Sequence, residues 1–231
     1  MFGLTDAELE ALRLSLLVAS VATVASLPFG ILVGVALARG QFWGKSALNV
    51  LVHLPLVLPP VVTGYILLVA FGRRGVIGEF LAEQLGIVFA FRWTGAALAA
   101  AVMGFPLMVR AIRLAVEAVD SRLEEAAGTL GAGRIATFML VTLPLALPGI
   151  IAGAVLGFAK AMGEFGATIT FVSNIPGETQ TLPSAIYSLL QVPGEESGAI
   201  RLTVIAILVA VGALIASEVL AQRARKRADG R

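Results

Sequence analysis

The chain has 231 residues, of which 58% are hydrophobic and 14% are charged, and its formal net charge is +2. Because soluble domains carry about 25% charged residues, this composition excludes a soluble globular protein and indicates one embedded in a membrane. The absence of cysteine excludes disulfide bonds and thiolate chemistry.

The first predicted element is a helix that begins near Asp6. Thr5 and Glu8 have the spacing of a capping box, which marks a helix start. The apolar stretch 12–37 follows and exceeds the roughly 20 residues that a spanning helix needs. The opening "MFGLTDAELEALR" is acidic, whereas a cleavable signal peptide begins with basic residues, so we expect this helix to be a membrane span.

The segment 40–46, "GQFWGKS", looks like a phosphate-binding loop but does not fit the pattern. That loop has four residues between its glycines and joins a strand to a helix, whereas this segment has three and joins two apolar spans. We therefore expect no nucleotide binding here. Arg39 and Lys45 are better explained as residues that set the membrane topology.

Prolines distinguish the first four predicted spans, 12–37, 47–71, 93–113 and 141–161, from a passive anchor. These spans hold seven of the chain's ten prolines: Pro28, Pro55, Pro59, Pro60, Pro106, Pro144 and Pro148. Because proline lacks the backbone donor and clashes with the preceding turn, we expect kinked or partly unwound helices. The fourth span also has a glycine every four residues, a spacing typical of closely packed helices: Gly149, Gly153 and Gly157.

The loop 118–140, between the third and fourth spans, contains a short polar helix. Ser121 and Glu124 have capping-box spacing, and Asp120 reinforces the helix start. Gly131 fits the position at which a helix ends in a left-handed turn. An apolar stripe runs between these ends at helical spacing: Leu123, Ala126, Ala127 and Leu130. So short a helix is only marginally stable alone. It lies either on its own spans or lipid, or against a partner protein. The residues favour neither alternative over the other.

The region 165–191 is too interrupted for a simple span, because it contains Asn174, Pro176, Gly177 and Pro183. We predict the end of the fourth span, a loop and a short helix near 182–190, and whether the segment re-enters the bilayer stays open. A fifth span follows at 202–220. The basic end "RARKRADGR" is predicted to be solvated.

Five spans put the two termini on opposite sides, and the distribution of basic residues selects the orientation. With the N-terminus outside, eleven Lys and Arg residues are inside and six are outside. The inner set is Arg39, Lys45, Arg110, Arg113, Arg122, Arg134, Arg223, Arg225, Lys226, Arg227 and Arg231. The positive-inside rule therefore predicts an outer N-terminus, an inner C-terminus and a cytoplasmic loop 118–140.

The cytoplasmic loop carries a specific motif. Glu125-Ala126-Ala127 is followed after three residues by Gly131 and after nine more by Val141-Thr142-Leu143-Pro144. This pattern resembles the EAA loop of type I ABC importer permeases, and its only departure is valine for isoleucine at Val141. Nearly the whole chain takes part in the resemblance, since "HLPLVLPPVVTGYILL" and "SNIPGETQTLPSAIY" look like the permease subunit of molybdate importers. Sulfate permeases share the general layout.

The resemblance implies an all-α membrane protein of about five transmembrane helices, N-terminus outside and C-terminus inside, forming a single permease domain over 1–231 in the cell inner membrane. It implies two ATPase subunits, a second copy of this chain and an extracytoplasmic oxyanion-binding protein as partners. The EAA loop would couple to the ATPase, which binds the ATP, so no cofactor of this chain is expected. The coupling residues would be Glu124, Glu125, Ala126, Ala127, Leu130 and Gly131.

A transport path needs weak polar sites that release their cargo. Lys160 and Glu164 have the spacing of a mutually neutralising helical pair, which we favour, while the alternative makes "GEFG" the hinge of an outer gate. Hydroxyl groups nearby would hydrogen-bond a tetrahedral oxyanion. The candidates for the path and gate are Pro59, Pro60, Thr63, Gly163, Glu164, Gly166, Thr168, Thr170 and Ser173.

Two other classes of function compete with an ABC permease. A gradient-driven secondary transporter would explain the broken helices but leaves the capped polar helix without a partner. An enzyme would need a nucleophile and base, and neither these nor a metal site around the single His53 is predicted, nor is nucleic-acid binding. Among cargoes, molybdate, tungstate and sulfate are similar tetrahedral dianions and stay open.

Overall fold

The computed structural model describes the backbone of residues 4–228, and the side chains in that range except those of 217 and 224–228. This range forms helices and contains no strand. The last residues of the predicted basic end, 229–231, lie outside the described residues. The helices in chain order are α1 (Asp6–Arg39), α2 (Lys45–Val57), α3 (Pro60–Phe71), α4 (Val76–Leu85), α5 (Trp93–Glu117), α6 (Ser121–Thr129), α7 (Arg134–Thr137), the π-helix η1 (Phe138–Thr142), α8 (Leu143–Met162), α9 (Gly166–Val172), α10 (Leu182–Leu190) and α11 (Glu196–Ala228).

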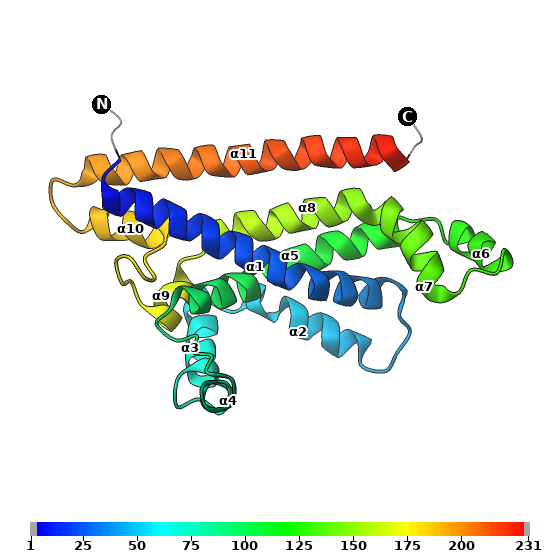
Figure 1. Cartoon of the computed structure of the whole chain (residues 1–231), viewed down its shortest axis with the longest axis horizontal. Helices are drawn as coiled ribbons and strands as arrows, with labels where there is room; N and C mark the ends of the chain where they lie inside the picture. The colour runs from blue at the N-terminus through cyan, green and yellow to red at the C-terminus, as the bar shows by residue number, and fades with distance from the viewer. Residues whose placement is uncertain (1–3, 229–231) are drawn as a thin grey trace.

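The long helices α1, α5, α8 and α11 run along the long axis of the molecule and form a bundle (Figure 1). The short helices α6 and α7 lie at one end of this bundle, whereas α9 and α10 lie at the other. α3 and α4 project to one side. Since α1 begins near α10 and α11 ends near the level of α6, the chain crosses the bundle an odd number of times, as five spans require.

Four helical segments of the described chain are long and apolar enough to cross a membrane: Asp6–Arg39, Trp93–Glu117, Arg134–Met162 and Glu196–Arg223. The pair α2 and α3 provides a fifth span if the two are taken together, although they meet at an angle of 114°. The capping box of Thr5 and Glu8 is present and α1 begins at Asp6, as predicted.

The segment 47–71 is therefore broken at its prolines, where the sequence predicted a kinked or partly unwound span. Leu58, between the two helices, has extended backbone angles of φ −70° and ψ 142°. A residue before proline is pushed into this conformation, and Pro60 then starts α3 at a position that needs no backbone donor. Two consecutive prolines thus end one helix and begin another.

Small residues in α5 and α8 allow these two helices to approach closely. Ala96, Ala99 and Ala100 of α5 are almost completely buried. A Cβ added to Gly153 of α8 would lie 3.0 Å from the carbonyl oxygen of Met108 in α5. This confirms the predicted packing role of the glycines in the fourth span.

The fourth span begins in a π-helix and ends at Met162, one residue after the predicted bound of 161. The N–H of Leu143 donates to the carbonyl of Phe138, five residues back, and Pro144 has no N–H to continue the α-helical pattern. α8 ends at Met162, and α9 is a separate short helix. The prediction that 165–191 contains the end of the span was wrong, whereas the helix near 182–190 is confirmed as α10. α4 was not predicted.

Candidate coupling site and transport path

The helix α6 begins at Ser121 and is capped by Asp120. The extended backbone of Asp120 lets its Oδ1 accept the N–H of Arg122 at 2.9 Å. The predicted capping box of Ser121 and Glu124 was therefore wrong. Aspartate one residue earlier satisfies the free donor, and the carboxylate of Glu124 is used elsewhere.

The other end of α6 closes in a left-handed turn at Gly131, whose φ is +88°, as predicted. Gly131 N–H donates to the carbonyl of Gly128, and Ala132 N–H donates to that of Ala127, both at 3.0 Å. These two bonds form a Schellman motif, which satisfies the last carbonyls of the helix. α6 is thus fixed at both ends by local hydrogen bonds.

The apolar stripe of α6 is largely uncovered. No residue of α6 is buried, and the side chains of Leu123 and Leu130 are 48% and 88% exposed. The described part of the chain therefore covers about half of Leu123 and very little of Leu130, and it leaves most of this stripe open. A lipid surface or a partner protein is left to cover them.

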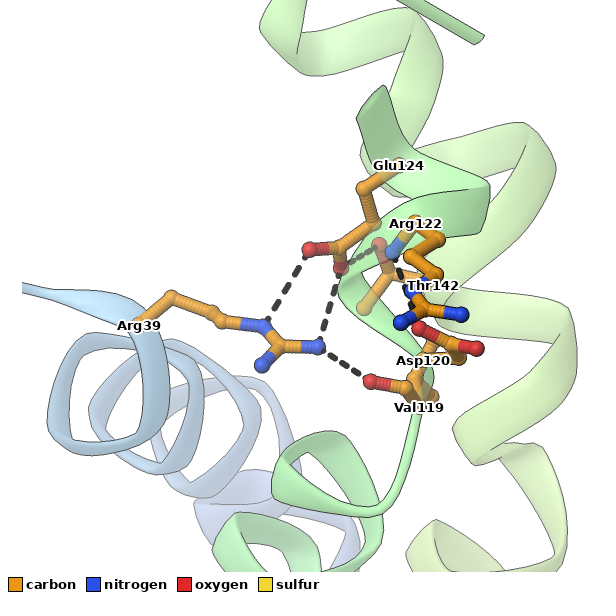
Figure 2. A network of polar contacts seen from close by, with 6 residues as sticks. All are labelled: Arg39, Val119, Asp120, Arg122, Glu124 and Thr142. Carbon is orange, nitrogen blue, oxygen red and sulfur yellow. Dashed lines mark hydrogen bonds and ion pairs between the residues drawn. The ribbon is translucent and has the colours of Figure 1, made fainter. Parts of the chain in front are cut away.

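Glu124 and Glu125 are adjacent but have different surroundings. The carboxylate of Glu124 contacts Arg39 at the end of α1, with 3.3 Å between Oε2 and Nε, and accepts the hydroxyl of Thr142 at 2.7 Å (Figure 2). Nη2 of Arg39 also donates to the carbonyl of Val119 at 2.7 Å. Glu125 is exposed and has no ion pair among the described residues. One glutamate faces the bundle and the other faces outward.

A groove of about 880 Å³ lies between the end of α1 and the segment from α6 to η1. Both glutamates line it, together with Arg39, Gln41 and Arg134. Of the coupling residues predicted from the sequence, Glu124 and Glu125 therefore line one hollow at one end of the bundle, and the other four do not.

The predicted path residues also meet at one place, where α3 packs against α9. Pro59 and Pro60 form the bend before α3, and Thr63 is one turn into it. The other candidates lie at the break after α8 and along α9: Gly163, Glu164, Gly166, Thr168, Thr170 and Ser173. The contact is close, because a Cβ added to Gly64 would lie 2.5 Å from the carbonyl oxygen of Ala167.

Glu164 joins the two helices on either side of this break. Its side chain is buried, its Oε2 lies 2.9 Å from Nζ of Lys160, and its Oε1 accepts the N–H of Ala167 at 3.0 Å. The favoured ion pair is therefore present. The second oxygen caps the start of α9, a role that the sequence did not reveal.

The hydroxyl groups near the break differ in how they are satisfied. Thr170 donates within its helix to the carbonyl of Gly166 at 2.8 Å. The hydroxyl of Thr63 is buried and has no hydrogen-bond partner in the described chain. Ser173 ends α9 with φ +68°, a backbone conformation that is strained for a residue other than glycine. Thr63 and Ser173 are therefore the unusual members of the set.

A polar cluster at the far end of the bundle was missed. The hydroxyl of Ser15 in α1 accepts the N–H of Leu182 at 2.6 Å, and the fully buried Thr179 accepts the N–H of Ile175 at 2.9 Å. Arg201 of α11 contacts Glu8 of α1 at 2.8 Å. The partners Ser15 and Leu182, like Glu8 and Arg201, are far apart in the sequence, so no local spacing marks these two pairs.

The family model for the inner membrane component of binding-protein-dependent transport systems matches residues 26–226. The chain belongs to this family. It is 63% identical over 225 residues to the molybdenum transport system permease protein ModB of Escherichia coli K12, covering 97% of this chain and 98% of that one. It is 54% identical over 220 residues to ModB of Haemophilus influenzae, covering 95% and 96%. A sulfate transport system permease protein, CysW of Synechococcus elongatus, is 40% identical over 174 residues, covering 75% and 60%.

Solved structures of ABC transporters share the fold. A bacterial alginate ABC transporter superposes with a TM-score of 0.71 at 17% identity, covering 96% of this chain and 80% of that one. The inward-facing methionine ABC transporter superposes with a TM-score of 0.67 at 16% identity, covering 94% of each. The chain is thus a multi-pass inner membrane protein with the all-α fold of an ABC importer permease, as the EAA resemblance implied.

Proposed function

We propose that the chain is the permease subunit of an ABC importer that moves molybdate into the cell. The observation that carries this proposal is α6, a helix capped at both ends whose two leucines are exposed. The identity of 63% to a molybdenum transport permease supports the cargo. α6 is the coupling helix, and a separate ATPase subunit covers its apolar stripe.

The working unit contains two copies of this chain, two ATPase subunits and an extracytoplasmic binding protein that delivers the anion. Hydrolysis of ATP takes place in the partner, and this chain is not an enzyme. ATP binding closes the two ATPases, the docked α6 helices move together, and the spans open outward to receive the anion. Hydrolysis then returns the spans to the inward-open state. The excess of basic residues near α6 supports its cytoplasmic position.

The anion path runs past the contact between α3 and α9. The buried hydroxyl of Thr63, which lacks a partner, is available to a passing oxyanion, and Thr168 and Ser173 lie on the facing helix or its end. Neutral hydroxyl groups bind a dianion weakly enough to release it. Thr63→Val keeps the side-chain shape and should lower uptake of the anion without releasing the ATPase.

A purified system separates an ABC permease from a gradient-driven secondary transporter. The chain is reconstituted in vesicles alone, or with its ATPase and binding protein, and uptake of labelled molybdate is measured with and without ATP. Uptake that needs all three proteins and ATP supports the proposal. Uptake by the chain alone, driven by an ion gradient, would identify a secondary transporter and refute it.

Sulfate is the second candidate cargo, because the sulfate permease CysW is 40% identical over 174 residues. Molybdate, tungstate and sulfate compete in the same vesicles. Strong inhibition by tungstate and weak inhibition by sulfate is the result expected for a molybdate importer. The reverse order would assign the chain to sulfate transport.

A further inference from the structure

Glu124 connects three segments that are far apart in the sequence. Its carboxylate contacts Arg39, 85 residues earlier at the end of α1, and Thr142, 18 residues later at the end of η1 (Figure 2). Arg39 also holds the carbonyl of Val119, in the link between α5 and α6. The end of α1, the link before α6 and the end of η1 are therefore connected through the side chains of Arg39 and Glu124.

The backbone of α6 packs on η1 and α7, its own neighbours in the chain. The reach across to α1 is made by the side chain of Arg39, whose guanidinium presents two donors to Glu124. Such a forked contact fixes orientation better than a single point contact. This charged pair is thus a polar contact that joins α1 to α6.

The pair lies in a partly shielded place. The side chains of Glu124 and Arg39 are 21% and 32% exposed, and both line the groove beside α6. In water such a pair is weak, but a protein that covers the groove would exclude solvent and strengthen it. The contact would then tighten when a partner docks.

The hydroxyl of Thr142 gives Glu124 a second connection, to the start of α8. Thr142 is buried and is the last residue of the π-helix. In such a helix each N–H bonds to the carbonyl five residues back, one residue farther than in an α-helix. Pro144 removes a further donor from the same turn. The backbone between α6 and α8 therefore has fewer α-helical hydrogen bonds to keep it rigid. The hydrogen bond from Thr142 to Glu124 connects the two helices directly.

We propose that Glu124, Arg39 and Thr142 form a joint that makes α6 move as one body with the inner ends of α1 and α8. This inference rests on the proposed function, in which a partner ATPase displaces α6. The outward-facing Glu125 belongs to the docking surface, whereas Glu124 passes the displacement on. Arg39, Glu124 and Thr142 are positioning residues, because they act on the spans and not on the cargo.

Three substitutions each remove part of the joint with little change in shape: Glu124→Gln, Arg39→Gln and Thr142→Val. We expect each variant to retain its ATPase while uptake per ATP hydrolysed falls about fivefold or more, the scale of typical coupling between sites. Exchanging the charges, Arg39→Glu with Glu124→Arg, should restore only the part of the loss that is due to the ion pair, because the bonds to Val119 and Thr142 stay broken. Glu117→Gln is the matched control, because it removes an ion pair with Arg113 inside α5 that does not touch α6.

A distance measurement distinguishes a joint from a merely structural contact. The chain has no cysteine, so spin labels attach only at introduced thiols, here Leu32→Cys in α1 and Arg122→Cys in α6, both at exposed positions. In complex with an ATPase whose thiols are blocked, the distance between the labels should stay constant when ATP binds. With Glu124→Gln added, the distance should change between the two states.

The outcomes separate the joint from the function on which it rests. If uptake per ATP and the label distances of Glu124→Gln and Thr142→Val match the parent while the ATPase stays bound, the joint is refuted and the proposed function stands. An equal loss in Glu117→Gln would also refute the joint, because any inner ion pair would then have the same effect. Failure of the unsubstituted chain to bind an ATPase would refute the proposed function and the joint together.

Discussion

The two ends of the helical bundle differ in how far their side chains are buried and paired. At the end that holds α10, polar groups are buried and paired within the chain: Glu8 contacts Arg201, and Ser15 accepts the N–H of Leu182. At the end that holds α6, the apolar side chain of Leu130 is 88% exposed and Glu125 has no ion pair among the described residues. The buried pairs at the first end are made within the chain, whereas the second end leaves an apolar stripe and a charged group exposed.

Among substitutions at the two ends, Gly131→Val should have the largest effect, on stimulation of the ATPase. The φ of +88° disfavours a β-branched residue by about 1–2 kcal/mol, so the turn that ends α6 should rearrange. No other atom lies near the added Cβ, so the membrane-embedded bundle should fold as before. We expect stimulation of the ATPase to fall about tenfold or more.

Gly133→Ala is the matched control for that variant. Gly133 has an ordinary φ of −69° and open space around its Cβ position, so the change should be tolerated. Full stimulation in Gly131→Val would show that the shape of this turn is not needed for coupling.

Glu125→Lys should affect only the end of the bundle that holds α6. Reversing an exposed charge on a docking surface disturbs complementarity, and we expect the affinity for the ATPase to fall about tenfold. Membrane insertion and thermal stability should not change. Binding is measured with the detergent-solubilised chain, and Glu178→Lys, an exposed glutamate in the loop before α10, is the control. Equal weakening in both variants would contradict a local docking role.

Glu8→Gln should affect only the end of the bundle that holds α10. Glu8 is buried and Arg201 is partly exposed, so the unfolding free energy should fall by about 1–2 kcal/mol, less than for a fully buried pair. Thermal unfolding measures this loss, and the affinity for the ATPase should stay the same. The exposed Glu10→Gln on the same helix should leave the stability unchanged. If the two variants unfold alike, the pair with Arg201 contributes nothing.

Ser15→Ala should produce the smallest effect. The change leaves the buried N–H of Leu182 without its acceptor, which should cost about 1 kcal/mol. Ser20→Ala removes an exposed hydroxyl from the same helix and should cost nothing measurable. Hydrogen exchange at Leu182 reports on the bond itself, and equal exchange rates in Ser15→Ala and the parent would argue against it.

Local signals in the sequence predicted a helix end correctly where only one residue could act as the cap. The box of Thr5 and Glu8 and the turn at Gly131 depend on residues within one helical turn, and both are present. At the start of α6, Asp120 and Ser121 were both good caps. The choice between them is linked to Glu124, whose carboxylate is occupied by Arg39 from another helix.

The proline segments show the same limit. "LPLVLPP" and "LPLALPG" look alike in sequence, yet the first contains a break of 114° and the second lies inside the continuous helix α8. The sequence predicted kinks in both. The size of each bend depends on packing partners elsewhere in the chain, such as α9 against α3, which no local pattern records.

The break at Pro59 has a consequence for the biogenesis of the protein. α2 has 13 residues, about 20 Å of helix, which is shorter than the roughly 30 Å of the hydrocarbon layer, and α3 is shorter still. The helices that hold them, α5 and α9, are both made later. The second span to be synthesised therefore gains its packing partners only after α5 and α9 have been made, and α9 is followed only by α10 and α11.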